Sequence, residues 1–406
     1  MRASIGGPVF HDLSSEDLVI RYIASSIVRS KGAHHFSKLE VLSDLPLLFA
    51  LSARLADRLR NDVTAICLLA SSGMAVGIAT ALVAKVPLTF FHRAGFPKPE
   101  ARGLGSRFRP DRRFSAKVAI LDSHERSRYT SALCIQELKR YESLQPVQVV
   151  VPFSFDTLID PLNTHQEIDY TIILNFSNAV HDIVQFRDDL TAEDLISLVE
   201  NPRSSLWKYP PNDDSEQGYS EFNVPGIMQR PRWFLGRGTN MAMVKPISAE
   251  LANLCMHINP SDDGIWDFFL DPAFLRQFAL QAGSVLGLED YDHIVGVGHL
   301  GTAVAIALAY YNQDRFRGTI ITHLGDYGLI PYPKNLENKR VLPIEMRLKT
   351  GAYAVDVFTR LTGLGAEVRK YVSVFSPLKP LGVFELSRQT SIRHLSARGV
   401  EFLSLA

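Results

Sequence analysis

The sequence has few cysteines and no excess of charge of either sign. Its 406 residues include three cysteines, Cys67, Cys134 and Cys255, without a C-x-x-C pair, which argues against a disulfide framework or a zinc site and indicates a reducing compartment. The 43 Lys and Arg balance 43 Asp and Glu, which removes the simplest argument for a non-specific nucleic-acid or membrane binder. With 46% hydrophobic and 21% charged residues, the composition excludes an intrinsically disordered chain.

Uninterrupted apolar segments are also scarce. Residues 1–8 contain no apolar run of the kind that a secretory signal needs. Residues 65–84 carry no charge, but Ser71, Ser72, Gly73 and Gly77 interrupt them, as expected for a buried strand, a loop and a helix of small residues. We therefore expect a soluble, cytoplasmic protein that does not enter a membrane.

Common catalytic signatures are missing. The sequence contains no G-x-S-x-G motif and no P-loop. Residues 296–301 match the letters G-x-G-x-x-G after an apolar run, but no acidic residue follows about twenty positions later at a strand end, as a dinucleotide site requires. The function must therefore be sought in the organisation of the chain.

The chain contains an internal repeat. Residues 66–79 align with residues 294–307, so that Gly73 corresponds to Gly301 at an offset of 228 positions. Both segments consist of an apolar run, a glycine-containing turn and a stretch rich in Ala, Val and Ile. This pattern predicts a strand, a tight turn and a helix in each copy.

Two further matches keep the same order. A second strand–loop–helix is expected at 117–122 with 131–138, and again at 340–345 with 354–361. Upstream, Asp44 and Asp271 each precede a helix-like segment, as N-cap residues do. The sequence therefore predicts two tandem copies of one α/β unit.

The segment between the copies has a different pattern. Residues 170–176 are typical of a strand, and Thr191 with Asp194 predicts a capped helix start. Residues 202–225 are rich in Pro, Asn, Asp, Ser and Gly, which indicates a surface connection. The expected division is a first domain at 1–165, a connecting insertion at 166–228 and a second domain at 229–406.

The second copy carries the more informative loop. An apolar strand ends at Glu345, and the following segment to Tyr353 reads EMRLKTGAY. It resembles the PRPP-binding signature of type I phosphoribosyltransferases, in which acidic residues precede a Thr-Gly phosphate loop. Residues 298–302 lie where that family has its pyrophosphate loop. The most similar subfamily is the orotate phosphoribosyltransferases. Residues 392–402 resemble the C-terminal segment of that subfamily.

The resemblance implies a fold and a set of site residues. The fold is α/β, with two tandem phosphoribosyltransferase-like (Rossmann-like) parallel-sheet units forming a pseudo-dimer, and ligands bind at the carboxyl ends of the strands. It also implies Mg²⁺ as cofactor, although no residue is assigned as a metal ligand. The residues implied for phosphate and ribose are Glu345, Lys349, Thr350, Gly351, Ala352 and Tyr353, and those implied for pyrophosphate are Gly298, His299, Gly301 and Thr302.

Both copies depart from the family pattern. Met346 replaces the second acidic residue, and the first-copy loop after Asp122 has no glycine to admit a phosphate. The catalytic cations implied by the family, Arg93, Lys98 and Arg102, occur only in the first copy. We therefore hypothesise one composite site, with the phosphate loop from the second copy and the cations from the first.

Three functions remain open. The leading one is binding of PRPP or a nucleotide with Mg²⁺, with transfer of ribose 5-phosphate to or from a nitrogen base if the degenerate motifs still support a pentosyltransferase. The second is a non-catalytic nucleotide-sensing or scaffolding pseudoenzyme. The third is an effector of an antiviral defence system that acts on nucleotides or nucleic acid. The basic strip at 102–117 offers a surface for nucleic acid or a partner protein, or a solvated face.

Overall fold

The computed structural model describes residues 10, 12–30, 33–69, 73–92, 103–104, 115–124, 129–155, 168–200, 245–256, 258, 268–269, 271–323, 329–331, 333, 335–348, 351–375 and 391–405. Its labelled helices are α1 (Ser15–Ser26), η1 (Glu40–Ser43), α2 (Leu45–Asp57), α3 (Met74–Ala84), α4 (Tyr129–Leu138), α5 (Phe176–Gln185), α6 (Ala192–Glu200), α9 (Ala249–Cys255), α10 (Pro272–Leu286), η4 (Leu288–Asp290), α11 (Gly298–Tyr311) and α12 (Ala352–Gly363). We call residues 10–200 the first unit and residues 245–405 the second unit.

The first unit is built on a six-stranded sheet with the order β5-β4-β3-β6-β7-β8. Adjacent strands run parallel except for the edge strand β5, which is antiparallel to β4. A separate antiparallel hairpin joins β1 (Ile27–Ser30) to β2 (Ala33–Phe36). The sheet strands are β3 (Ala65–Leu69), β4 (Leu88–His92), β5 (Gly103–Leu104), β6 (Ala116–Leu121), β7 (Leu144–Ser154) and β8 (Asp169–Asn175).

The second unit contains a seven-stranded sheet with the order β12-β11-β10-β13-β14-β15-β9. Again one edge strand, β12, is antiparallel while the other neighbours are parallel. The strands are β9 (Lys245–Pro246), β10 (His293–Val297), β11 (Thr319–His323), β12 (Leu329–Ile330), β13 (Val341–Arg347), β14 (Lys370–Phe375) and β15 (Glu401–Ser404). Apart from β9, the two sheets have the same order of corresponding strands, and the α/β class with two parallel-sheet units is confirmed.

The local signals in the sequence are confirmed at the helix starts. The Asp44 side chain accepts from the backbone N–H of Leu47 at 3.0 Å, and the Asp271 side chain accepts from that of Ala273 at 2.9 Å. Thr191 accepts from the N–H of Asp194 at 3.1 Å. These side chains satisfy N–H groups that a helix start leaves without a partner inside the helix.

The expected insertion contributes to the first sheet. Strand β8 pairs in parallel with β7, and helices α5 and α6 lie against β8, α1 and β2. Residues 156–167 and 201–244 lie outside the described residues, so the expected boundaries at 165 and 228 stay a prediction. Arg187 donates to the carbonyls of Ala24 and Ile27 at 2.9 and 3.0 Å, which fixes this segment to α1.

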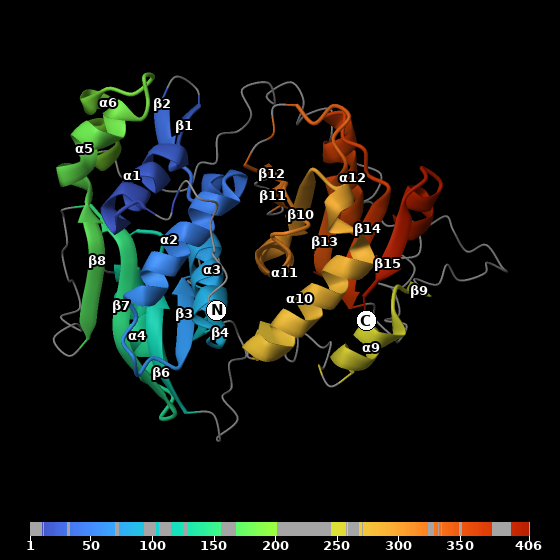
Figure 1. The fold of residues 1–406 in the computed structure, drawn as a ribbon, viewed down its shortest axis with the longest axis horizontal. Helices are drawn as coiled ribbons and strands as arrows, with labels where there is room; N and C mark the ends of the chain where they lie inside the picture. The colour runs from blue at the N-terminus through green and yellow to red at the C-terminus, as the bar shows by residue number, and fades with distance from the viewer. Residues whose placement is uncertain are drawn as a thin grey trace, which may run out of the picture.

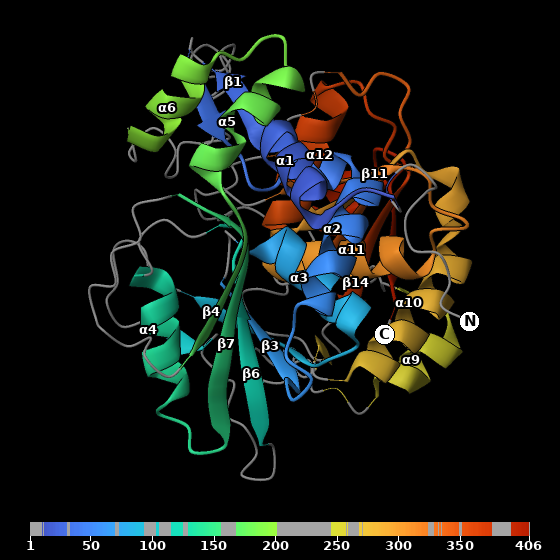
Figure 2. The same ribbon diagram turned by 60° about the vertical axis from the view of Figure 1, so that its left-hand side comes forward.

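Helices cover both faces of each sheet. In the first unit, α4 packs on one face and α2 with α3 on the other (Figure 2). In the second unit, α12 packs on one face and α11 on the opposite one. Burial on both faces explains why the strands are almost continuously apolar.

The two units are packed against each other through their inner helices. Helix α3 lies against α11 between the two sheets (Figure 1). Phe49 meets Tyr310 edge to face at a centroid distance of 5.2 Å, and Phe90 meets Phe269 at 5.7 Å. One hydrophobic cluster runs continuously from the first unit into the second. The units therefore share a core.

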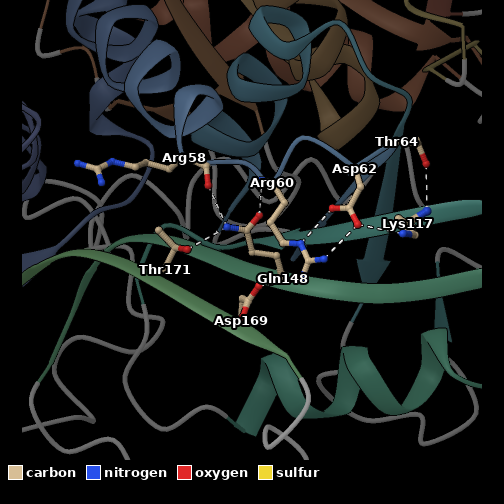
Figure 3. Close-up of polar contacts among 8 residues, drawn as sticks. All are labelled: Arg58, Arg60, Asp62, Thr64, Lys117, Gln148, Asp169 and Thr171. Atoms are coloured by element: carbon tan, nitrogen blue, oxygen red, sulfur yellow. Dashed lines mark hydrogen bonds and ion pairs between the residues drawn. The ribbon is translucent and has the colours of Figure 1, made fainter.

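A polar network joins the α2–β3 connection to the amino ends of the first-sheet strands (Figure 3). The buried Gln148 side chain on β7 accepts from the N–H of Arg60 at 2.9 Å, and donates to the carbonyl of Arg58 and the hydroxyl of Thr171, both at 2.9 Å. The Arg60 guanidinium pairs with Asp62 and Asp169, and Lys117 of the predicted basic strip also pairs with Asp62. Polar contacts thus connect the amino ends of these strands to the α2–β3 connection.

The three cysteines are free and buried, and the sulfurs of Cys67 and Cys134 lie 3.6 Å apart. Among the described helices, none combines the length and the apolar character that a membrane span requires.

Candidate functional site

Polar side chains lie in one row at the carboxyl edge of the second sheet. His323 on β11 and Glu345 on β13 both pair in register with Val297 on β10, and Ser373 on β14 pairs with Glu345. Residues paired in register project to the same face, so these side chains point toward the α12 side. This edge is where α/β proteins bind ligands.

Helix α11 begins directly after β10, without the turn that the sequence predicted. The helix starts at Gly298, whose φ of 70° is in the left-handed region that favours glycine. Gly298 alone therefore makes the turn from β10 into α11. No side chain caps α11, so the N–H groups of its first turn and the positive end of its dipole face this edge.

Gly301 and Thr302 pack α11 onto the sheet. A Cβ at Gly301 would lie 2.6 Å from the carbonyl oxygen of Ile344. The buried Thr302 hydroxyl donates to the carbonyl of Gly298 at 2.8 Å and contacts the Thr322 hydroxyl. His299 lies half-buried in the first turn, and burial lowers its pKa.

Helix α12 has a similar start on the neighbouring strand. Gly351 precedes it with a φ of 73°, and no side chain caps the helix. Ala352 is its first residue, and Tyr353 follows with 60% of its surface exposed. Lys349 and Thr350 lie outside the described residues. Since β10 and β13 are adjacent, two helix N-termini without side-chain caps open at the same edge.

Glu345 is buried at the end of β13, with 6% of its surface exposed. Burial raises its pKa to about 8, and the nearby Tyr371 hydroxyl offsets this only in part. Its Oε1 atom has no hydrogen-bond partner among the described residues. Met346, in the place of the second acidic residue, is buried as well. The end of β13 thus presents one carboxyl group, which is largely protonated at neutral pH.

A second polar group at this edge was not anticipated from the sequence. His323 is fully buried, and its Nε2 lies 2.8 Å from Asp356 Oδ2 on α12. Arg360 donates to both oxygens of Asp356 at 3.0 Å. Burial would raise the pKa of Asp356, but His323 and Arg360 together outweigh burial and lower it. The i,i+4 spacing of Asp356 and Arg360 was visible in the sequence, whereas their pairing with His323 depends on the fold.

The first unit has the same backbone arrangement. A Cβ at Gly73 would lie 2.8 Å from the carbonyl oxygen of Leu121, just before Asp122. Gly73 therefore corresponds to Gly301, and Asp122 to Glu345, as the repeat predicted. Both glycines let a helix start approach a strand end more closely than any other residue allows.

The side chains at this edge of the first unit are different. The backbone N–H of Ser123 donates to Asp122 Oδ1 at 2.6 Å, and the Ser123 hydroxyl contacts His124 Nδ1 at 3.0 Å. The His124 ring stacks on Phe153 at 5.5 Å. Further rings complete an aromatic cluster at the carboxyl ends of β6, β7 and β8, namely Tyr22, Phe36, Phe155 and Phe176. These rings belong to the core on the α2–α3 side of the first sheet, whereas Glu345 projects to the α12 side of the second sheet.

The composite-site hypothesis stays a prediction, because Arg93, Lys98 and Arg102 lie outside the described residues. The structure does bring another part of the first unit to this region, since η1 lies against β11, which ends at His323. Burial raises the pKa of Glu40 in η1 to about 7, partly offset by Ser37.

The described residues do not fit the Mg²⁺ expected from the resemblance. Mg²⁺ prefers ionised carboxylates and keeps several waters. Glu345 is buried and its raised pKa leaves it largely uncharged, and Met346 supplies no oxygen. The ionised Asp356 at this edge is already bonded to His323 and Arg360. No cluster of three His, Cys, Asp or Glu side chains suited to a metal exists in the described part of the chain.

The fold defines an α/β protein with two parallel-sheet units. No family profile matches the chain, and no curated protein matches it. Solved structures do match part of the chain. UMP synthase from Leishmania donovani is 14% identical over 47% of this chain and 43% of its own, with a TM-score of 0.34. This chain thus spans less than half of that protein.

Two phosphoribosyltransferases are also similar. Orotate phosphoribosyltransferase from Aeropyrum pernix is 12% identical over 42% of this chain and 99% of its own, with a TM-score of 0.34. Adenine phosphoribosyltransferase from Trypanosoma brucei is 12% identical over 41% of this chain and 81% of its own, with a TM-score of 0.30. These values are too low to assign the chain to a family.

Proposed function

We propose that the second unit binds the phosphate of a phosphorylated ribose, such as PRPP or a nucleotide, at the carboxyl edge of its sheet. The observation that carries the proposal is the pair of adjacent helices, α11 and α12, that begin at left-handed glycines without a side-chain cap. Backbone N–H groups and the helix dipoles stabilise an anion at such a place.

The sequence around α12 favours a sugar phosphate over a simple anion. Glu345 and the Thr350-Gly351 pair resemble the PRPP signature. The buried Oε1 of Glu345, which has no hydrogen-bond partner among the described residues, would bond a ribose hydroxyl. If the protein has turnover, ribose 5-phosphate moves to or from a nitrogen base. The α11 and α12 N-termini would then stabilise the anionic groups on either side of an oxocarbenium-like carbon.

A non-catalytic nucleotide sensor is the second candidate. Met346 in the place of the second carboxylate favours it, since a single carboxyl that is largely protonated at neutral pH holds the ribose less firmly. The same residues bind the ligand in both candidates, and only product formation separates them.

We also propose that the units arose by tandem duplication and that one of them lost its site. The common strand order and the matching contacts of Gly73 and Gly301 support the duplication. The absence of glycine from the loop after Asp122 supports the loss, because a phosphate needs a close approach of the backbone there. One ligand per chain is then expected.

Calorimetric titration tests the proposal. PRPP and a panel of nucleoside monophosphates are titrated into wild type, Glu345→Ala and the matched first-unit variant Asp122→Ala. Glu345→Ala should weaken binding by at least about tenfold, or about 1.4 kcal/mol, while Asp122→Ala leaves it unchanged. Absence of binding to wild type, or equal effects of the two variants, would contradict it.

A further inference from the structure

Glu345 lies in surroundings that suit an uncharged group. It shares its face of the sheet with Val297, and this face packs on apolar α12 residues that include Ala354 and Phe358. The described structure places no cation where it would lower the pKa of Glu345, and the Tyr371 hydroxyl is the single offset to burial. A carboxyl in such a place keeps its proton at neutral pH.

The protonated form of Glu345 retains hydrogen-bonding capacity. A protonated carboxyl carries one donor and one acceptor, whereas a carboxylate only accepts. Its Oε1 atom is buried without a hydrogen-bond partner among the residues that the structure describes, and leaving such an atom unsatisfied costs about 1–3 kcal/mol. A ligand hydroxyl, itself both donor and acceptor, can supply the missing bond.

The same features disfavour a metal ion at this edge. A divalent cation beside a neutral acid would lose water without gaining an ionised ligand. Met346 occupies the position from which a second carboxylate would act, and it is buried. The phosphate, in contrast, needs only the N–H groups and dipoles of α11 and α12.

We propose that Glu345 acts as an uncharged hydrogen-bonding group for a ribose hydroxyl, and that the second unit binds its ligand without a divalent cation. This inference rests on the proposed function and narrows its ligand class. Ribose 5-phosphate and nucleoside 5′-monophosphates fit, because one phosphate is held by helix N-termini. A pyrophosphate that requires Mg²⁺ fits less well.

Isothermal titration of ribose 5-phosphate and of PRPP tests the inference, in excess EDTA and in excess MgCl₂. The variants are Glu345→Gln, which mimics the protonated acid, Glu345→Ala, and the first-unit control Asp122→Asn. Thermal melts confirm that each variant is folded. The affinities for ribose 5-phosphate in EDTA and in MgCl₂ should agree within about threefold, which is a difference in binding free energy below ~1 kcal/mol. Glu345→Gln and Asp122→Asn should bind like wild type, and Glu345→Ala at least about tenfold more weakly.

The outcomes separate the two proposals. Binding that requires Mg²⁺, or a Glu345→Gln variant as weak as Glu345→Ala, overturns the inference and leaves the proposed function standing. If neither ribose 5-phosphate nor PRPP binds to wild type in either condition, both proposals are overturned.

Discussion

At the scale of single residues, two corresponding glycines determine how closely a helix approaches a strand end. Gly73 lies against Leu121 and Gly301 against Ile344, each just before an acidic residue. The sequence showed that the glycines correspond but indicated only that a turn was needed. The contacts show that the absence of a Cβ is what the packing requires.

Gly301→Ala should destabilise the protein by about 1–3 kcal/mol, because the new Cβ would overlap the backbone of β13. The matched control is Gly363→Ala at the end of α12, where a Cβ would meet nothing within 4 Å. This control should be as stable as wild type or slightly more so. Urea denaturation measures both, and equal stability of the two variants would contradict the packing argument.

Stability should depend on pH through Glu345. Its pKa is about 8 in the folded state against 4.5 for the ordinary group, so its contribution is complete below about pH 4.5 and is lost as the pH rises through about 8. The wild-type free energy of unfolding should fall over this window by up to about 1.4 kcal/mol per pH unit. Glu345→Gln should flatten the profile in denaturation series at several pH values. Parallel profiles of the two proteins would show that the carboxyl is ionised in the folded state.

At the scale of elements, the network in Figure 3 shows which polar contacts hold the first sheet to its connections. Gln148 is buried and makes three hydrogen bonds to two neighbouring segments. The ion pairs of Arg60 with Asp62 and Asp169 lie at the surface, where water and salt screen them. The amide of Gln148 should therefore matter more than the charges around it.

Gln148→Met should cost about 1–3 kcal/mol, because the N–H of Arg60 and the carbonyl of Arg58 would lose their partner. Asp169→Asn, which removes one surface ion pair of the same network, should cause a clearly smaller loss. Chemical denaturation of the two variants provides the comparison. A larger effect of Asp169→Asn would assign the stability to the charges instead.

At the scale of the whole molecule, the two units share one hydrophobic core. Their inner helices belong to one hydrophobic cluster, and the aromatic pairs Phe49–Tyr310 and Phe90–Phe269 cross between them. A core shared in this way couples the unfolding of its parts.

The chain should unfold in a single transition in scanning calorimetry. Phe269→Ala, which removes a buried ring of the second unit from the shared core, should cost about 3–5 kcal/mol and lower hydrogen-exchange protection in β3 and β10 together. Two separate transitions, or loss of protection in β10 alone, would show that the units unfold independently.

The sequence by itself determined the repeated order of strands and helices and the helix caps at Asp44, Asp271 and Thr191. These features are local, since apolar periodicity and N-cap side chains act within a few residues. The compressed start of α11 was not predicted, because it depends on how closely that helix packs on β13.

Only the tertiary structure decided what surrounds each strand end. Residues far apart in the chain bring aromatic rings to the first-unit edge, as with Phe36 and His124. In the second unit, the fold buries Glu345, leaves its Oε1 without a hydrogen-bond partner in the described part of the chain, and pairs His323 with Asp356. Burial, charge and hydrogen bonding at a strand end depend on the residues that pack over it from distant parts of the chain. A local sequence motif does not identify those residues.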